Sequence, residues 1–135
     1  MSLPRVRVVA AEIERDGAFL ITQRRAEAAL PNLWEFPGGR VRVGESDAEA
    51  LKRTLRDRLG TDVQIGHKLL AISHDYDGYS VDFVVYRCAV AGEPKSARVQ
   101  EVRWVAAEDL DDYDFPSADQ ASVDQLLGER TDPGG

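Results

Sequence analysis

Hydrophobic and polar residues alternate along several short stretches of this chain, and turn-forming residues separate one stretch from the next. Alternation with a period of two is typical of β-strands that bury one face. The clearest turn signals are Asp16-Gly17 and residues 75–78. We therefore expect strands at 5–13, 18–23, 40–43, 61–73, 79–90 and 101–105.

One stretch follows the helical period instead. Its apolar stripe consists of Leu51, Leu55 and Leu59. Ser46 and Glu49 precede the stripe in the spacing of a capping box, and Gly60 is a helix stop. A second helix is expected from Ser117 to about residue 127. Strands outnumber helices, so the pattern predicts a mixed sheet with packed helices, of the α+β or α/β class.

The length of 135 residues is that of one domain, which we expect over residues 1–130, followed by a flexible tail at 131–135. The 17 Lys and Arg against 24 Asp and Glu give a net charge of −7, which argues against a duplex nucleic acid as partner. A small phosphorylated ligand needs only a local basic cluster and stays open. The single cysteine, Cys88, excludes an internal disulfide and fits a cytoplasmic location. The chain also lacks the ~20-residue apolar run of a membrane span, so no membrane partner is expected.

Residues 38–61 have the order glycine pair, short strand, loop and capped helix, with the sequence GGRVRVGESDAEALKRTLRDRLGT. This segment resembles the Nudix box, G-x5-E-x7-R-E-U-x-E-E-x-G-U, where U is aliphatic. Three further stretches resemble motifs of MutT-like members: 33–39 (LWEFPGG), 102–105 (VRWV) and 113–119 (YDFPSAD). The resemblance covers roughly residues 6–127. It implies a Nudix fold, an α+β fold of the α/β/α sandwich type with a mixed sheet flanked by helices.

The resemblance also implies a reaction: hydrolysis of a nucleoside di- or triphosphate to a nucleotide and phosphate or pyrophosphate, with Mg2+ or Mn2+ as cofactor. This is the chemistry of MutT-like pyrophosphohydrolases of the nucleoside triphosphate or CTP type. Carried over position by position, the catalytic residues would be Asp57, Glu45 and Arg53, and the metal ligands Asp57 and Gly39. The implied substrate-binding residues are Arg24, Phe36, Gly38, Gly39, Arg58 and Asp119.

Four positions at which the family usually carries carboxylates are altered here. They hold Thr54, Asp57, Arg58 and Arg98, so one carboxylate is left and two positions have reversed sign. A fixed guanidinium several ångströms from a divalent ion repels it by on the order of several kcal/mol at an effective dielectric of about 20. Losing this kind of charge stabilisation lowers the rate of hydrolysis by a factor on the order of a thousand. We therefore expect weak or non-standard activity, or a site that uses no metal.

Several residues keep two interpretations. Arg58 could hold a phosphate directly or pair with nearby acids, and Asp57 could keep a metal role or pair with Arg53 one helical turn earlier. Phe36 could belong to the core or border a base. Asp119 could favour a helix start or accept a hydrogen bond from the exocyclic amine of a base.

Two functions follow from these alternatives. One is a MutT-like enzyme with weak or altered metal use. The other is a catalytically impaired nucleotide-binding or sensor module. The ligand in both cases is a nucleotide or a related phosphorylated small molecule. The sequence also allows a homodimer.

Overall fold

A computed structural model of the chain describes residues 4–26, 32–96, 98–99 and 101–116. Its strands are β1 (Arg5–Arg15), β2 (Ala18–Gln23), β3 (Trp34–Glu35), β4 (Gly38–Arg40), β5 (Val63–Tyr76), β6 (Tyr79–Val90) and β7 (Glu101–Ala106). The helices are α1 (Asp47–Leu59) and the short 3-10 helix η1 (Ala107–Asp112). The expected helix from Ser117, with Asp119, and the expected tail at 131–135 lie outside the described residues.

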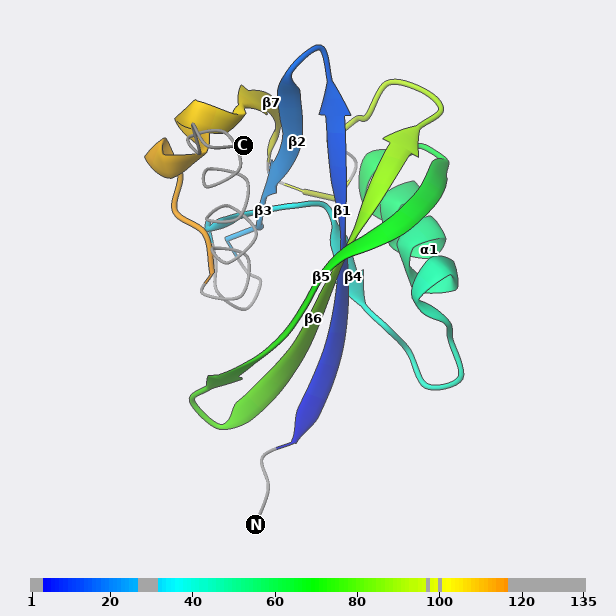
Figure 1. The fold of residues 1–135 in the computed structure, drawn as a ribbon, viewed down its shortest axis with the longest axis vertical. Helices are drawn as coiled ribbons and strands as arrows, with labels where there is room; N and C mark the ends of the chain where they lie inside the picture. The colour runs from blue at the N-terminus through cyan, green and yellow to red at the C-terminus, as the bar shows by residue number, and fades with distance from the viewer. Residues whose placement is uncertain (1–3, 27–31, 97, 100, 117–135) are drawn as a thin grey trace, which may run out of the picture.

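The strands form one mixed sheet in the order β3-β2-β1-β6-β5, with β4 also paired to β1 and β7 to β2 (Figure 1). β1 and β6 run parallel, whereas the other pairs are antiparallel. β1 is the central element because it pairs with β6 along most of its length, with β4 at Val8–Ala10 and with β2 only at its end. The predicted mixed sheet with a packed helix is confirmed.

Local sequence explains why α1 begins and ends where it does. The Ser46 hydroxyl accepts a hydrogen bond from the Glu49 backbone N–H at 3.1 Å, and the Glu49 carboxylate accepts one from the Ser46 N–H at 3.0 Å. Gly60 ends the helix in the left-handed region, at φ 64°, and its N–H donates to the Arg56 carbonyl. The predicted capping box and glycine stop are both confirmed.

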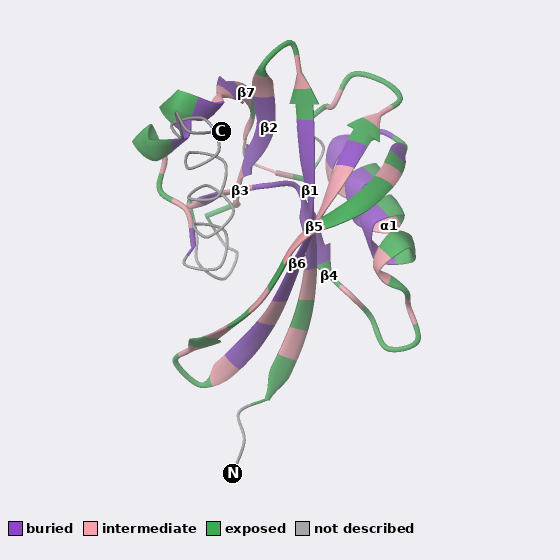
Figure 2. Cartoon of the chain, in the orientation of Figure 1, coloured by how far each residue is buried: buried purple, intermediate pink, exposed green. Residues whose placement is uncertain are grey.

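Two apolar clusters lie on opposite faces of the sheet. The leucine stripe of α1 packs with Val9, Leu20 and Val84 on one face. The other cluster contains Phe36, Phe83 and residues of β7 and η1. Figure 2 shows the side of α1 that meets the sheet as buried and its outer side as exposed. The strand β1 separates the clusters, and consecutive residues of β1 contribute to one or the other.

The expected strand at 40–43 is wrong in its position, because β4 is Gly38–Arg40 and residues 41–46 form a loop. The Glu45 N–H donates to the Arg42 carbonyl at 3.0 Å, which closes a turn where the alternating valines suggested extension. Gly44 in this turn has a φ of +80°, and Val43 is fully exposed. The helix η1 was not predicted. Within the described ranges, no helix has the length and apolar character that a membrane crossing requires.

Candidate functional site

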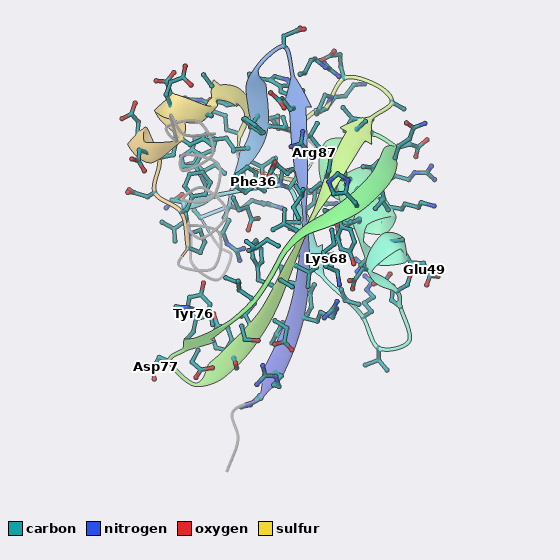
Figure 3. All side chains as sticks on the ribbon, in the orientation of Figure 1. Phe36, Glu49, Lys68, Tyr76, Asp77 and Arg87 are labelled. Carbon is teal, nitrogen blue, oxygen red and sulfur yellow. The ribbon has the colours of Figure 1, made fainter. Side chains whose placement is uncertain are left out.

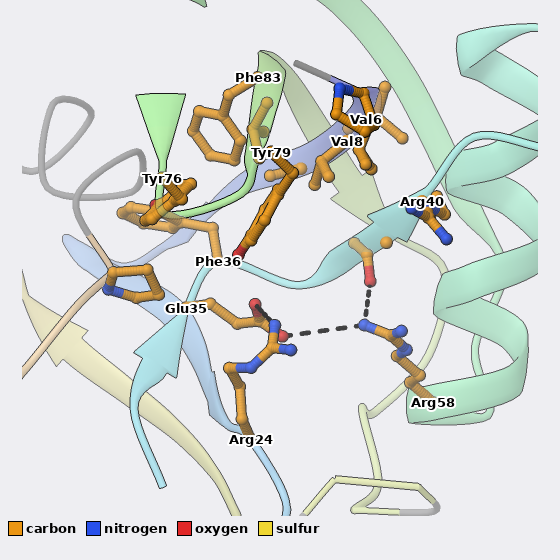
Figure 4. Close-up of a pocket in the computed structure, with 17 residues that line it drawn as sticks. Val6, Val8, Arg24, Glu35, Phe36, Arg40, Arg58, Tyr76, Tyr79 and Phe83 are labelled. Carbon is orange, nitrogen blue, oxygen red and sulfur yellow. Dashed lines mark hydrogen bonds and ion pairs between the residues drawn. The ribbon is translucent and has the colours of Figure 1, made fainter. Parts of the chain in front are cut away.

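A cavity of about 490 Å³ is lined by residues of β1, β3, β4, β5 and β6, and Arg58 of α1 reaches it from the side (Figure 4). One end of the cavity is charged and the other is apolar and aromatic. The charged end consists of Arg24, Glu35 and Arg58, beside Gly38 and Gly39, and Arg40 lines the wall next to its strand partner Val8. The apolar end consists of Val6, Val8, Phe36, Tyr76, Tyr79, Val81, Phe83 and Pro116.

Glu35 lies between two arginines at the charged end. Its Oε2 accepts a hydrogen bond from Nη1 of Arg24 at 2.9 Å, and its Oε1 is 3.7 Å from Nη1 of Arg58. The Glu35 side chain is 15% exposed, against 24% for Arg24 and 35% for Arg58. The arrangement arises because β3 pairs with the end of β2, which brings Glu35 opposite Thr22 and close to Arg24.

Arg58 reaches this end of the cavity from the last turn of α1. Its Nη1 donates a hydrogen bond to the Gly38 carbonyl oxygen. A Cβ atom at Gly39 would lie 2.7 Å from Cγ2 of Thr54 and 3.3 Å from Nη2 of Arg58, so only glycine allows α1 to approach β4 this closely. Gly39 therefore leaves the space that the Arg58 guanidinium occupies.

Thr54 lies on the side of α1 that faces β4, with 2% of its surface exposed. Its hydroxyl donates to the Ala50 carbonyl oxygen at 2.8 Å, one turn earlier in the same helix. Because its hydroxyl is hydrogen-bonded within the helix, Thr54 can be buried without leaving an unpaired polar group. The first of the altered carboxylate positions has thus become part of the packing between helix and strand.

Asp57 forms an ion pair with Arg98. Oδ1 of Asp57 is 3.4 Å from Nε of Arg98, and the two side chains are 50% and 67% exposed. The alternative ion pair between Asp57 and Arg53 is not formed, because Arg53 is bound to Glu45. Arg98 is held beside α1 by its backbone, whose N–H donates to the Arg58 carbonyl at 3.1 Å. Neither Asp57 nor Arg98 is among the described residues that line the cavity.

Glu45 and Arg53 join the loop before α1 to the helix itself. Two nitrogens of Arg53 contact the two carboxylate oxygens of Glu45 at 2.8 Å each, and Nη2 of Arg53 also donates to the Arg40 carbonyl at 2.8 Å. The Glu45 carboxylate accepts a further bond from the Arg42 N–H at 3.0 Å. The guanidinium of Arg53, followed by the Arg42 N–H, lowers the pKa of Glu45 to about 2. The contacts of these two side chains thus brace the loop against the helix.

Phe36 belongs both to the core and to the cavity wall, so its two interpretations are compatible. It is 1% exposed and stacks on Phe115 with ring centroids 5.8 Å apart. Tyr76 and Tyr79, which pack against the same core cluster, stack on each other at 5.3 Å. Figure 3 shows Tyr76 near the turn of the β5–β6 hairpin and Phe36 well inside the fold. The apolar end is therefore lined by aromatic side chains from β5, β6 and the segment after β3.

The residues at the four altered positions do not fit a divalent cation. Mg2+ requires oxygen ligands in near-octahedral geometry, and several of them are usually carboxylates. Here Thr54 uses its hydroxyl within α1, Asp57 pairs with Arg98, and Arg58 brings a positive charge to the Gly38 carbonyl. Within residues 4–26, 32–96, 98–99 and 101–116, no group of three or more His, Cys, Asp and Glu side chains is arranged to hold a metal.

The cavity residues that the sequence analysis missed include the charged Glu35 and Arg40 and the aromatic Tyr76 and Tyr79. Glu35 could have been suspected, because it directly precedes the Phe36-Pro37-Gly38-Gly39 segment and carries a charge next to a buried aromatic. The two tyrosines flank the turn of the β5–β6 hairpin, and their place over the cavity depends on how far that hairpin extends.

Comparison with known proteins agrees with this geometry. A sequence model of the NUDIX domain matches residues 8–125. The chain belongs to the NUDIX domain family. It is 33% identical to a CTP pyrophosphohydrolase of Escherichia coli over 126 residues, which cover 93% of each chain. It is also 33% identical to an 8-oxo-dGTP diphosphatase of Haemophilus influenzae over 124 residues, 90% of this chain and 91% of the relative.

Solved structures have the same fold. The solution structure of the E. coli ORF135 protein superposes with a TM-score of 0.80 at 30% identity and covers 98% of this chain and 96% of its own. The crystal structure of a MutT NUDIX hydrolase from Burkholderia pseudomallei gives 0.81 at 25% identity, with 90% and 97% coverage. This chain is therefore a MutT-like Nudix hydrolase family protein, and Thr54, Asp57 and Arg58 make its Nudix box a degenerate one.

Proposed function

We propose that this chain binds a nucleoside di- or triphosphate and hydrolyses it only weakly, or by a route that departs from the usual use of metal. Nudix hydrolases generally use a divalent cation such as Mg2+. The relatives named above act on CTP or on 8-oxo-dGTP, so nucleotides are the first ligands to test. A cavity with one cationic and one aromatic end supports a ligand with anionic phosphates at one end and a base at the other.

The phosphate chain would lie at the charged end. Arg24 and Arg58 present N–H donors there, and charge-assisted bonds from arginine to phosphate are among the stronger polar contacts. Gly38 and Gly39 line this end of the cavity, and the lack of a Cβ lets their strand approach β1 and α1 closely. Phe36 and Tyr79 would border the base. Asp119, which lies outside the described residues, keeps its proposed role as acceptor for an exocyclic amine.

One observation carries the proposal of weak hydrolysis. The guanidinium of Arg58 donates to the Gly38 carbonyl, at a position where the family pattern has a carboxylate. A cation there opposes the binding of a second, divalent cation. Asp57 remains as the one carboxylate available for residual use of Mg2+ or Mn2+, with Gly39 as a backbone ligand, and its exposed pair with Arg98 would have to open first.

A nucleotide-binding or sensor module without turnover is the second candidate. The same observation favours it, because the changes affect the cation-holding positions whereas Arg24, Phe36 and the glycine pair still line the cavity. The two candidates share a ligand and differ only in whether product forms.

The test is release of pyrophosphate from a panel of ordinary, oxidised and methylated nucleoside triphosphates, with Mg2+ and with Mn2+. Wild type is compared with the variant Thr54→Glu/Arg58→Glu/Arg98→Glu, which restores the family carboxylates. We expect the variant to exceed wild type on the order of a thousandfold on its preferred nucleotide. Because Thr54 is buried, the double variant Arg58→Glu/Arg98→Glu is measured alongside the triple variant, and thermal unfolding verifies that both fold.

The matched control is Arg56→Glu. Arg56 is on the same helix and pairs with exposed Asp62 outside the cavity, so this variant changes charge without restoring a ligand position. Metal-dependent turnover by wild type at the rate of the restored variant would contradict the proposal. Nucleotide binding by wild type without any product would select the sensor module.

A further inference from the structure

We infer that the site takes the polyphosphate chain of its ligand as the metal-free anion, with Arg58 supplying the positive charge and Glu35 giving up its contacts to the incoming phosphates. This inference rests on the proposed nucleotide binding and specifies the ionic form of the ligand. It predicts that Mg2+ opposes binding, which is the reverse of what a metal-dependent site requires.

The Arg58 guanidinium already contacts two groups of the kind that a bound cation would use. Its Nη1 donates to the Gly38 carbonyl oxygen and lies 3.7 Å from the Glu35 carboxylate. Both acceptors lie at the charged end of the cavity, and the Arg58 side chain is only 35% exposed. The cation at this position is therefore a covalent part of α1, and no dissolved ion is needed to provide it.

The charges on the cavity wall favour a free polyanion. Among the described residues, Arg24, Arg40 and Arg58 line the cavity together with one carboxylate, that of Glu35. A nucleoside triphosphate near neutral pH carries about four negative charges, and its complex with one Mg2+ about two. Since attraction grows with the charge of the ligand, the metal-free form should bind more tightly to this surplus of arginine.

Glu35 holds the arginines in place while no phosphate is present. Each of its carboxylate oxygens faces a different guanidinium, an arrangement that two oxygens of a phosphate group can reproduce. An incoming phosphate competes with this carboxylate for Arg24 and Arg58 and is repelled by its charge. Removing the charge while keeping the shape, as in Glu35→Gln, should therefore raise affinity for polyphosphates.

The experiment measures the dissociation constant of the full chain for inorganic tripolyphosphate by calorimetry, once in EDTA and once in excess Mg2+. Tripolyphosphate has no base, so it probes the charged end alone. We expect binding in EDTA to be about tenfold tighter than in Mg2+. Arg58→Gln should weaken binding in EDTA by roughly tenfold to a hundredfold. Arg56→Gln, on the same helix but outside the cavity, should leave it unchanged.

Two further variants separate electrostatics from structure. Arg58→Lys keeps the charge without the planar fork, so it should keep the Mg2+ antagonism at reduced affinity. Glu35→Gln should bind tripolyphosphate about tenfold more tightly than wild type, and this gain should shrink in the double variant Glu35→Gln/Arg58→Gln. If Glu35 only positioned the arginines, the single variant would instead bind more weakly.

The outcomes distinguish this inference from the proposed function. Tighter binding of tripolyphosphate in Mg2+ than in EDTA would overturn the inference, and so would an unchanged dissociation constant in Arg58→Gln. Neither result would contradict the proposed binding of nucleotides. Failure of wild type to bind either tripolyphosphate or any nucleotide of the panel, in both conditions, would overturn the proposed function and this inference with it.

Discussion

The two halves of the Nudix segment, residues 38–61, follow the family's sequence pattern to different degrees. In the first half, from the loop before α1 to Arg53, the family pattern is intact: Glu45 and Arg53 are joined by two contacts of 2.8 Å, and the capping box is complete. In the second half, Thr54 is buried, Asp57 pairs with Arg98, and Arg58 enters the cavity. Both halves meet within one helix, so the difference cannot come from a change of fold.

The Nudix segment therefore carries two separable tasks. The first half fixes the loop against the helix and the helix against β4, through contacts that need no ion. The second half is where the family holds its cation, and here the same helical positions pack, pair at the surface or contribute a guanidinium. A chain can keep the Nudix fold and its cavity after the ion-holding positions have been replaced.

The largest effect should come from Gly38, on which the close approach of β4 to β1 depends. A Cβ at this position would lie 2.0 Å from the Val9 carbonyl oxygen, so Gly38→Ala forces two paired strands apart. We expect a loss of about 3 kcal/mol or more in the free energy of unfolding, measured by urea denaturation. Gly44→Ala is the control: it has open space and φ +80°, and it should cost only about 1 kcal/mol. Equal losses in the two variants would refute this account of β4.

The next effect concerns the brace between Glu45 and Arg53. The pKa of Glu45 is lowered to about 2 in the folded chain, from an ordinary value of 4.5, so the unfolded chain takes up the proton first as the pH falls. The stabilisation is therefore complete above about pH 5 and is lost as the pH falls toward 2. Glu45→Gln should be less stable than wild type at pH 7, and the gap should close in acid. Asp62→Asn, at an exposed pair with Arg56, should show a much smaller gap at pH 7. A gap for Glu45→Gln that is independent of pH would contradict the assignment.

The smallest effect should come from Asp57. Its pair with Arg98 is half exposed or more on both sides, and ion pairs of this kind contribute little. Asp57→Asn should change the free energy of unfolding by less than about 0.5 kcal/mol, as measured by thermal or urea unfolding. Any residual metal-dependent turnover should disappear in the same variant. Turnover that survives in Asp57→Asn would exclude this carboxylate as the remaining ligand.

The sequence was most informative where structure is decided locally. The helix α1 could be predicted because its cap, apolar stripe and glycine stop all lie within residues 46–60 and act on one another. The strand expected at 40–43 failed because Glu45 and Arg53 turn the backbone of this loop, a competition that alternation does not reveal. The family resemblance located Arg24, Phe36, Gly38, Gly39 and Arg58 on the cavity wall.

What could not be predicted depends on contacts between distant segments. Asp57 had a plausible partner one turn away, and its actual partner, Arg98, comes from the stretch before β7. Glu35 became the centre of the charged end only when β3 paired with β2 and α1 brought Arg58 within 3.7 Å. Side-chain charge is visible in a sequence, but which opposite charge it meets is decided by tertiary packing.

The central claim is that the second half of α1 no longer holds a divalent ion, and Mn2+ binding tests it most directly. Electron paramagnetic resonance measures free Mn2+ in the presence of the nucleotide-free chain, for wild type and for the restored variant Thr54→Glu/Arg58→Glu/Arg98→Glu. We expect the restored variant to bind Mn2+ and so to reduce the signal of the free ion. Wild type should leave this signal unchanged up to millimolar Mn2+, a concentration on the order of the dissociation constants of the weakest protein sites for hard cations. Stoichiometric, submillimolar Mn2+ binding by wild type that Asp57→Asn abolishes would contradict the claim.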